Sequence, residues 1–317
     1  GQCCMEPYAS RGPDAGIVLR ADPVVWPPAA GLALPTPLSP EQVESYRRRG
    51  FLVLRGLFGS EEVRGLVLEL ERLETEHGGQ AACVTGCSTA VSEAGCDRLR
   101  SLFAVHELPG SPLSTCLAGE RIVAPAQQLL GGDVYVHQSR ANFQPALVGL
   151  GFTWHSDFET WHAEDGMPKP RSLSAMVMCD GNTEANGALI VVPGSHLHFV
   201  RCRGRQGNAH WEASLQFQAY GTPGREELQT LVEQPDGGLT YCTGEPGDVV
   251  LFDCNLLHSS QCNRSPWPRR NLFVAYNADC NRLGDPPYAE RPRPEHVSHR
   301  LRSDVVRPLG PSATTDG

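Results

Sequence analysis

Apolar residues recur every three or four positions in the first part of the chain, which is the spacing of one buried helix face. Ser39 followed by Pro40 predicts the start of a short helix that runs to Arg49 and is closed by Gly50, because serine caps helices and proline suits the first helical position. A second helix is predicted from Ser60 to Gly78-Gly79, and its apolar residues share one face: Val63, Leu66, Val67, Leu70 and Leu73. Residues 51–54 read as a buried strand between these helices, and residues 99–130 are predicted to be helical.

After residue 133 the pattern changes to short apolar runs separated by Gly, Pro and Asn. Each run has the length of a buried strand, and the breaks between them are typical of turns. The runs are residues 134–137, 173–178, 188–192, 249–252 and 272–276. This spacing predicts a β-sandwich or barrel.

These patterns divide the chain into an arm, one domain and a tail. The arm is rich in Pro, Ala and Gly and shows no sustained period, so it is predicted to be extended. We expect the arm at residues 1–38, a single domain at 39–309 with helical support at 39–132 and a β core at 133–309, and a flexible tail at 310–317.

Composition narrows the classes of partner. The 317 residues include 27 Lys+Arg and 36 Asp+Glu, a formal net charge of −9, which argues against nucleic acid or another polyanion. No apolar run approaches the roughly 18 residues needed to cross a bilayer, and no secretory segment is evident, so the cytoplasm is the expected compartment. The 12 Cys form no Cys-x-x-Cys pair and read mostly as small buried thiols, with Cys83 and Cys87 the best-spaced pair for a metal or disulfide.

Candidate chemistry centres on the run Trp154-His155-Ser156-Asp157. On a strand, residues two apart share a face, so His155 and Asp157 could reach one ion. His258, at the end of a later apolar strand, supplies a third ligand. Two histidines and a carboxylate form the facial triad that leaves open positions on Fe(II). The alternative is that these histidines are structural.

Arg269 opens the strand that follows this last histidine. A fixed guanidinium near the metal would suit a dicarboxylic 2-oxo acid, whose keto end chelates iron and whose far carboxylate takes a bidentate partner. The alternative for Arg269 is a solvated surface cation.

Two longer runs, VHQSRAN at 136–142 and FTWHSDFETWHAEDGMP at 152–168, closely resemble the signature of the ectoine hydroxylases. These enzymes belong to the phytanoyl-CoA dioxygenase-like branch of Fe(II)/2-oxoglutarate oxygenases. The resemblance continues through PGSH at 193–196, FDCN at 252–255, Pro268-Arg269 and Asn271, and more weakly over residues 22–293.

The resemblance implies a mainly β fold with flanking helices and a double-stranded β-helix core of the jelly-roll, cupin-like type. It implies a cytoplasmic enzyme, often a homodimer, that uses Fe(II), 2-oxoglutarate and O2 to convert ectoine to 5-hydroxyectoine with release of succinate and CO2. The positions that match the iron ligands are His155, Asp157 and His258. Those that match the 2-oxoglutarate site are Arg269, Ser174, Asn142, Arg140 and Phe152. Those that match the substrate pocket are Gln138, Thr160, Trp161, Asn271, Phe273 and Arg291.

The residue types in the implied substrate pocket suit a flat cationic amidine. The aromatic faces of Trp161 and Phe273 attract such a cation by about 0.5–2 kcal/mol, although core packing is the alternative for both. The presence of Asp157 favours hydroxylation over halogenation, because related halogenases lack that carboxylate.

Several positions depart from the family pattern and leave other functions open. Leu150-Gly151 stands where the family typically has a lysine, and Leu257-His258-Ser259-Ser260 replaces the usual Met-His-Gly-Ser. One alternative is a sister hydroxylase acting on proline, another cyclic amino acid or a natural-product intermediate. Alternatives of other classes are a non-catalytic cupin-like binding or sensor protein and a zinc hydrolase that uses the same ligands.

Overall fold

The computed structural model describes residues 7–77, 89–204, 210–301 and 304–310. The predicted helix end at Gly78-Gly79, the pair Cys83 and Cys87 and nearly all of the predicted tail lie outside these residues.

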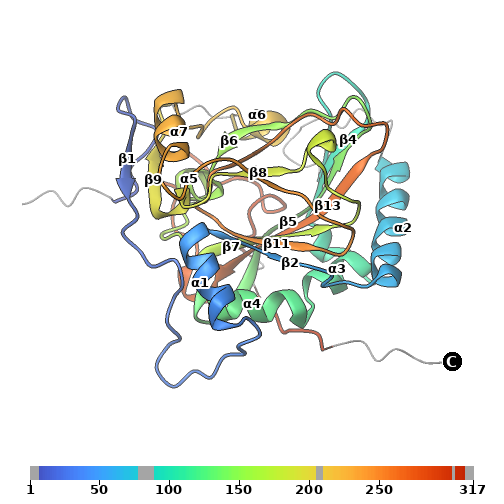
Figure 1. Ribbon diagram of the computed structural model, residues 1–317, viewed down its shortest axis with the longest axis horizontal. Coiled ribbons are helices and arrows are strands. Elements are labelled where there is room, and N and C mark those ends of the chain that lie inside the picture. Colours follow the sequence, from blue (N-terminus) through green and yellow to red (C-terminus); the bar gives the residue numbers. More distant parts are fainter. Residues whose placement is uncertain (1–6, 78–88, 205–209, 302–303, 311–317) are drawn as a thin grey trace, which may run out of the picture.

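Two antiparallel sheets form the centre of the molecule (Figure 1). The larger sheet has seven strands in the order β2-β11-β7-β13-β5-β4-β3. Their bounds are β2 (Phe51–Leu54), β3 (Ala90–Ser92), β4 (Leu99–Phe103), β5 (Val134–Gln144), β7 (Ser172–Met178), β11 (Val249–Asp253) and β13 (Arg269–Ala278). The smaller sheet has the order β10-β8-β12-β6, with β6 (Phe152–His155), β8 (Leu189–Val191), β10 (Thr240–Cys242) and β12 (His258–Ser260).

Helices cover the outside of the larger sheet, while the smaller sheet lies over its inside. In Figure 1, α3 and α4 lie below β7 and β11, and β6 and β8 lie above these two strands. The helices are α1 (Pro40–Arg49), α2 (Ser60–His77), α3 (Pro112–Leu117), α4 (Glu120–Leu130), α5 (Asp157–Asp165), α6 (His210–Phe217) and α7 (Arg225–Val232). Short 3-10 turns are η1 (Val105–Glu107), η2 (Glu184–Asn186), η3 (Ser195–Leu197) and η4 (Asp279–Asn281). This arrangement is the predicted mainly β fold with a double-stranded β-helix core and flanking helices.

The first helices form where the sequence predicts them. The Ser39 side chain accepts a hydrogen bond from the main-chain N–H of Gln42, and the Gln42 side chain accepts one from the N–H of Ser39, which completes a capping box at α1. Gly50 ends α1 with φ of 80°, and a Cβ there would lie 2.5 Å from His196 Nδ1, so only glycine fits. In α2, the predicted face is buried at Val63, Leu66, Leu70 and Leu73.

The prediction of a helix from residue 99 is wrong at its start. Leu99–Phe103 is strand β4, and all five of its residues are buried. Leu99, Leu102 and Phe103 have the spacing of a helix face, which is why the pattern misleads. The strand is set by its pairing with β5, where Ser101 lies opposite Asn142 and Phe103 opposite Arg140.

Alternate residues of the larger sheet face opposite sides. In β7 and β13, the side chains that face outward join one apolar core with α2 and α4: Leu173, Ala175, Val177, Leu272, Val274 and Tyr276. Full burial of a leucine such as Leu272 contributes about 1.5–3 kcal/mol relative to exposure. This core anchors the strands that carry the inward-facing residues.

The inward-facing residues form cross-strand rows through β5, β13 and β7. Arg140 pairs with Phe273, which pairs with Met176, and the neighbouring row runs from Gln138 through Ala275 to Ser174. A bulge at Ala275/Tyr276 shifts the register beyond these rows. The strand register therefore gathers polar and aromatic side chains on the surface that faces the smaller sheet.

The N-terminal segment is mostly extended and packs against α5 and a short two-stranded sheet. Strand β1 (Gly16–Leu19) pairs with β9 (His198–Arg201). Ser10 Oγ and Arg11 Nε both donate to Glu159 Oε1 at 2.7 Å, and all three residues are buried. The segment thus contributes a buried ion pair to α5.

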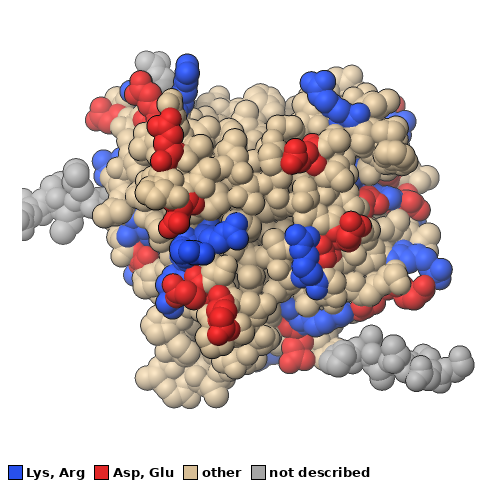
Figure 2. Space-filling view, in the orientation of Figure 1, with Lys and Arg blue, Asp and Glu red and all other residues tan. Residues whose placement is uncertain are grey.

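The distribution of charge and the apolarity of the helices bear on polyanion and membrane partners. Positive and negative side chains intermingle on the face shown in Figure 2. Within the described part of the chain, none of the helices has the length and apolarity to cross a membrane.

Candidate active site

Two histidines and an aspartate meet between the two sheets. His155 ends β6 and His258 begins β12, and the two residues lie directly opposite each other in the strand register. The Nε2 atoms of His155 and His258 lie 3.8 and 3.9 Å from Asp157 Oδ1, and all three side chains are buried. The sequence prediction of a His155, Asp157 and His258 cluster therefore has its geometric counterpart.

The secondary structure that positions Asp157 differs from the predicted one. The prediction placed His155 and Asp157 on one face of a strand, but β6 ends at His155 and Asp157 is the first residue of α5. Ser156 caps the helix by accepting a hydrogen bond from the main-chain N–H of Glu159. The capped turn, not strand alternation, directs the carboxylate toward the two imidazoles.

The donor atoms of this triad fit a metal ion. Each imidazole is oriented by a main-chain carbonyl: His155 Nδ1 lies 2.7 Å from Thr153 O, and His258 Nδ1 lies 3.0 Å from Leu256 O. When Nδ1 donates to a carbonyl, Nε2 is left as a metal ligand, which is the usual arrangement around ligating histidines. Ser174 Oγ donates to Asp157 Oδ2 at 3.2 Å and leaves Oδ1 facing the imidazoles.

Electrostatics keep His155 and Asp157 in their ligating forms. Burial and the neighbouring His258 lower the pKa of His155 to about 3, so its imidazole is neutral at physiological pH. Burial raises the pKa of Asp157, but His258, His155 and Arg140 outweigh it, and the net pKa lies below its ordinary value. A neutral imidazole and an ionised carboxylate are the forms that bind a divalent cation.

A first cavity extends from the triad toward the start of β13. Its lining includes four residues predicted to hold 2-oxoglutarate: Arg140, Asn142, Phe152 and Arg269. Ser174, the fifth, bonds to the triad carboxylate instead. The cavity is also lined by His155 and His258, so an anion bound there would lie against the metal ligands.

Arg269 is the most informative residue of this cavity, because it is 5% exposed and has no carboxylate within ion-pair distance among the described residues. Its Nη2 donates to Gln144 Oε1 at 2.7 Å and to Gly187 O at 2.8 Å. Burial lowers the pKa of Arg269 to about 10, which still leaves it protonated at neutral pH. A buried cation without an acidic partner is costly, and a ligand carboxylate would relieve that cost.

A second cavity lies on the other side of the triad. Its lining includes Asp157 of the triad and three residues predicted to contact substrate: Gln138, Thr160 and Trp161. Arg140, Phe152 and His155 line both cavities. The triad therefore lies where two cavities of different chemistry meet.

Three residues predicted for the substrate pocket lie elsewhere. Phe273 lines the first cavity, with the Arg140 guanidinium carbon 5.1 Å from its ring centroid. Asn271 lies beside Arg269 and, with its amide oriented to satisfy both atoms, accepts a hydrogen bond from Arg269 Nη1 at 2.9 Å. Arg291 is exposed and lines neither cavity, whereas Arg293, two residues further on, lines the second.

Comparison with known proteins identifies the family. Residues 46–271 match the family model for phytanoyl-CoA dioxygenase (PhyH). The ectoine dioxygenase of Bordetella parapertussis is 46% identical over 306 residues, which cover 96% of each chain. The chain belongs to the phytanoyl-CoA dioxygenase family.

Solved structures of this family agree with the fold. EctD from S. alaskensis, crystallised with 2-oxoglutarate and 5-hydroxyectoine, matches with a TM-score of 0.81 and 38% identity over 96% of this chain and 98% of that chain. The same protein with bound Fe matches with a TM-score of 0.80 and 36% identity over 96% and 99% of the two chains.

Several residues of this family member's site escape prediction from the sequence. Arg100 lies with its guanidinium carbon 4.0 Å from the Phe152 ring centroid, and its Nη1 bonds both carboxylate oxygens of Glu93 at 2.8 Å. Gln144 orients Arg269. These residues sit on strands that the pattern missed or at strand ends, and no motif marks them.

Arg293 is a further residue that the sequence analysis missed. Its Nε and Nη2 donate to the two carboxylate oxygens of Asp165 at 2.8 and 2.5 Å. Burial raises the pKa of Asp165, but Arg293 and His137 outweigh it and lower it to about 2. The bidentate pair fixes the Arg293 guanidinium at the second cavity.

Proposed function

We propose that this chain is an Fe(II)- and 2-oxoglutarate-dependent dioxygenase that hydroxylates ectoine to 5-hydroxyectoine, with release of succinate and CO2. The observation that carries the proposal is a buried two-histidine, one-carboxylate triad at the meeting point of two cavities. Such a triad leaves positions open for a co-substrate and oxygen. The family membership and the likeness to EctD support the same reaction.

His155, Asp157 and His258 would hold the iron. An Fe(II) ion in this triad supplies oxidative chemistry together with O2 and 2-oxoglutarate. The main-chain carbonyls at Thr153 and Leu256 fix the imidazole rings, and Ser174 fixes the carboxylate. These contacts preorganise the three donor atoms before the ion arrives.

The first cavity would bind 2-oxoglutarate. Arg269 would pair with the far carboxylate, since a guanidinium binds a carboxylate bidentately and this one has no acidic partner of its own. Gln144 and Asn271 hold the Arg269 side chain in place. Arg140 and Phe152 border the passage between the two cavities.

The second cavity would bind the substrate. Trp161 offers an aromatic face to a delocalised amidinium, and Gln138 and Thr160 offer hydrogen-bonding groups. Arg293 offers a fixed cation to the substrate carboxylate. These side chains would orient the ring carbon that is hydroxylated toward the open face of the triad.

The decisive experiment measures succinate formation and product mass with Fe(II) and 2-oxoglutarate, first with ectoine and then with proline. We expect succinate to form with ectoine in step with a product heavier by one oxygen atom, and a His155→Ala variant to form neither. Faster turnover of proline or another cyclic amino acid would reassign the substrate within the family. Tight binding of ectoine without turnover would indicate a sensor, and full activity of the His155→Ala variant would remove the metal assignment.

A cytoplasmic location and a homodimer belong to the same proposal, and both rest on the family resemblance. Light scattering of the purified protein tests the assembly. A monomeric mass at working concentration would contradict it.

A further inference from the structure

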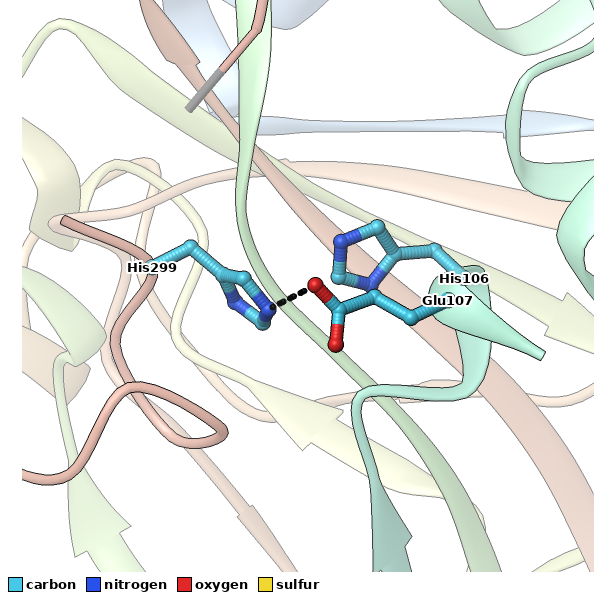
Figure 3. Close-up of side chains that lie close together, drawn as sticks. All are labelled: His106, Glu107 and His299. Carbon is cyan, nitrogen blue, oxygen red and sulfur yellow. Dashed lines mark ion pairs between the residues drawn. The ribbon is translucent and has the colours of Figure 1, made fainter. Parts of the chain in front are cut away.

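A second group of two histidines and a carboxylate lies apart from the triad. His106 and Glu107 belong to η1, and His299 belongs to the C-terminal segment that runs beside β5. One potential ligand atom from each residue lies within 4.8 Å of the others. Figure 3 shows the two rings and the carboxylate gathered around a common space.

Strand β5 orients both imidazoles of this group. His106 Nδ1 lies 2.6 Å from Ser139 Oγ, and His299 Nδ1 lies 3.3 Å from His137 O. The main-chain N–H of His299 also donates to His137 O at 2.8 Å, which fixes the backbone behind the ring. His299 Nδ1 faces a carbonyl and so donates, which leaves its Nε2 for a ligand. His106 Nε2 is left in the same way in the tautomer whose Nδ1 donates to Ser139 Oγ.

The Nε2 atom of His299 is buried and lacks a hydrogen bond to any described residue. The residue as a whole is 1% exposed. Glu107 Oε1 lies 3.5 Å from His299 Nε2, a separation close to the 3.8 and 3.9 Å found between the imidazoles and the carboxylate of the triad. A buried nitrogen without a partner costs about 1–3 kcal/mol, and a bound cation would remove that cost.

Access from solvent and the types of donor atom also favour a metal. The Glu107 side chain is 39% exposed, which provides a route from solvent. Neutral imidazole with carboxylate is a donor set that Zn²⁺ prefers.

We propose that His106, Glu107 and His299 form a second metal site, which binds Zn²⁺ or a similar divalent transition metal through two imidazole nitrogens and one carboxylate oxygen. Water would complete the coordination, since zinc is usually four-coordinate with ligands about 2.0–2.2 Å away. The site is separate from the iron triad in both ligands and position along the chain.

The position of this site indicates what the metal would do. Its ligands join η1 to the C-terminal segment, and in that segment Val297 O accepts a hydrogen bond from Gln138 Nε2 at 2.7 Å. Gln138 lines the second cavity. A bound cation would therefore fasten the C-terminal segment next to a wall of the proposed substrate cavity.

The test is a titration of the full-length, metal-free protein with Co²⁺, whose visible absorption reports imidazole and carboxylate coordination. Accessible thiols, such as those of Cys262 and Cys280, are alkylated first so that they do not bind the metal. We expect two equivalents for the unchanged chain, one for His299→Gln and one for His155→Ala. The control is His296→Gln, a neighbouring half-buried histidine outside the cluster, which should still bind two.

A second variant protects the test against misfolding. Glu107 is largely at the surface, so Glu107→Gln should leave the melting temperature of the metal-free protein unchanged while weakening the second equivalent at least tenfold. Zn²⁺ should raise the melting temperature of His155→Ala, in which the second site is intact, and not that of the His155→Ala/His299→Gln double variant. The second site would be overturned if both His299→Gln and Glu107→Gln still bound two equivalents of Co²⁺, or if His155→Ala bound none. Neither outcome alters the test of the iron triad.

Discussion

Along β13, Leu272 and Val274 face the helices and belong to the core shared with α4, whereas Phe273, between them, faces the first cavity. The same division separates the two arginines that begin this strand. Arg269 points inward and has no acidic partner in the part of the chain that the structure describes, while Arg270 forms ion pairs with Asp180 and Glu71 at 2.8 and 2.9 Å. A single step along the strand thus separates residues that stabilise the fold from residues that line the cavity, because side chains alternate between faces.

The comparison predicts that substitutions of outward-facing residues lower the free energy of unfolding and leave turnover unchanged. Leu272→Ala should lower the free energy of unfolding by about 2–5 kcal/mol, since it removes a fully buried side chain and leaves a cavity. Urea denaturation measures this, and turnover per folded molecule should be unchanged. Leu272→Ile is the control and should cost less than about 1.5 kcal/mol. Lost turnover with unchanged stability would contradict the division between the faces.

Substitutions of inward-facing residues should impair turnover and leave the stability of the fold nearly unchanged. Arg269→Gln should raise KM for 2-oxoglutarate about 100-fold. The reason is that removal of one partner of a buried charge pair costs about 3 kcal/mol of binding free energy. The melting temperature of the ligand-free protein should change little, because the lost hydrogen bonds to Gln144 and Gly187 are offset by removal of a buried charge that has no acidic partner among the described residues. Steady-state kinetics and thermal melting test both statements, and an unchanged KM would exclude the proposed carboxylate contact.

The adjacent arginine provides the matched outward case. Arg270→Gln breaks hydrogen bonds to Asp180 and Glu71 and should lower the free energy of unfolding by about 1–2 kcal/mol. The effect is small because both carboxylates are partly exposed to solvent. KM for 2-oxoglutarate should stay as it is in the unchanged chain. A higher KM in this variant would show that the two arginines act together.

The smallest expected effect comes from two serines on the inner face of β7. Ser174→Ala removes the hydrogen bond to Asp157 and should lower kcat/KM about three- to tenfold, the consequence of about 1 kcal/mol. Ser172→Ala is its control, because Ser172 Oγ donates to Tyr276 O at 2.7 Å, away from the triad. We expect Ser172→Ala to affect only stability, and equal kinetic losses in both variants would contradict a specific role for Ser174.

The sequence predicts the fold where local signals and burial agree. The cap at Ser39, the glycine at Gly50 and the apolar runs after residue 133 each mark an element that the structure contains. The sequence pattern predicts a helix where strand β4 lies. Arg100 of this strand is buried by its ion pair with Glu93, and the spacing of apolar residues does not indicate such a tertiary partner.

The structure brings the three residues of the predicted triad together. His155 and His258 lie opposite each other because β6 and β12 pair, and a strand pairing places their side chains together. The cavities were harder to predict. The sequence predicts Arg291 for the substrate pocket, whereas in the structure it is Arg293, paired with Asp165, that lines the second cavity.

The buried contact between Arg11 and Glu159 has a consequence for the order in which the molecule is made. The two residues are 148 positions apart, so the N-terminal segment leaves the ribosome well before α5 exists. Contacts between such distant segments form slowly, because a long loop must close before they gain any energy. Arg11 must therefore wait for the helix that begins with Asp157, and the packing behind that triad carboxylate is completed by a residue synthesised 148 positions before Glu159.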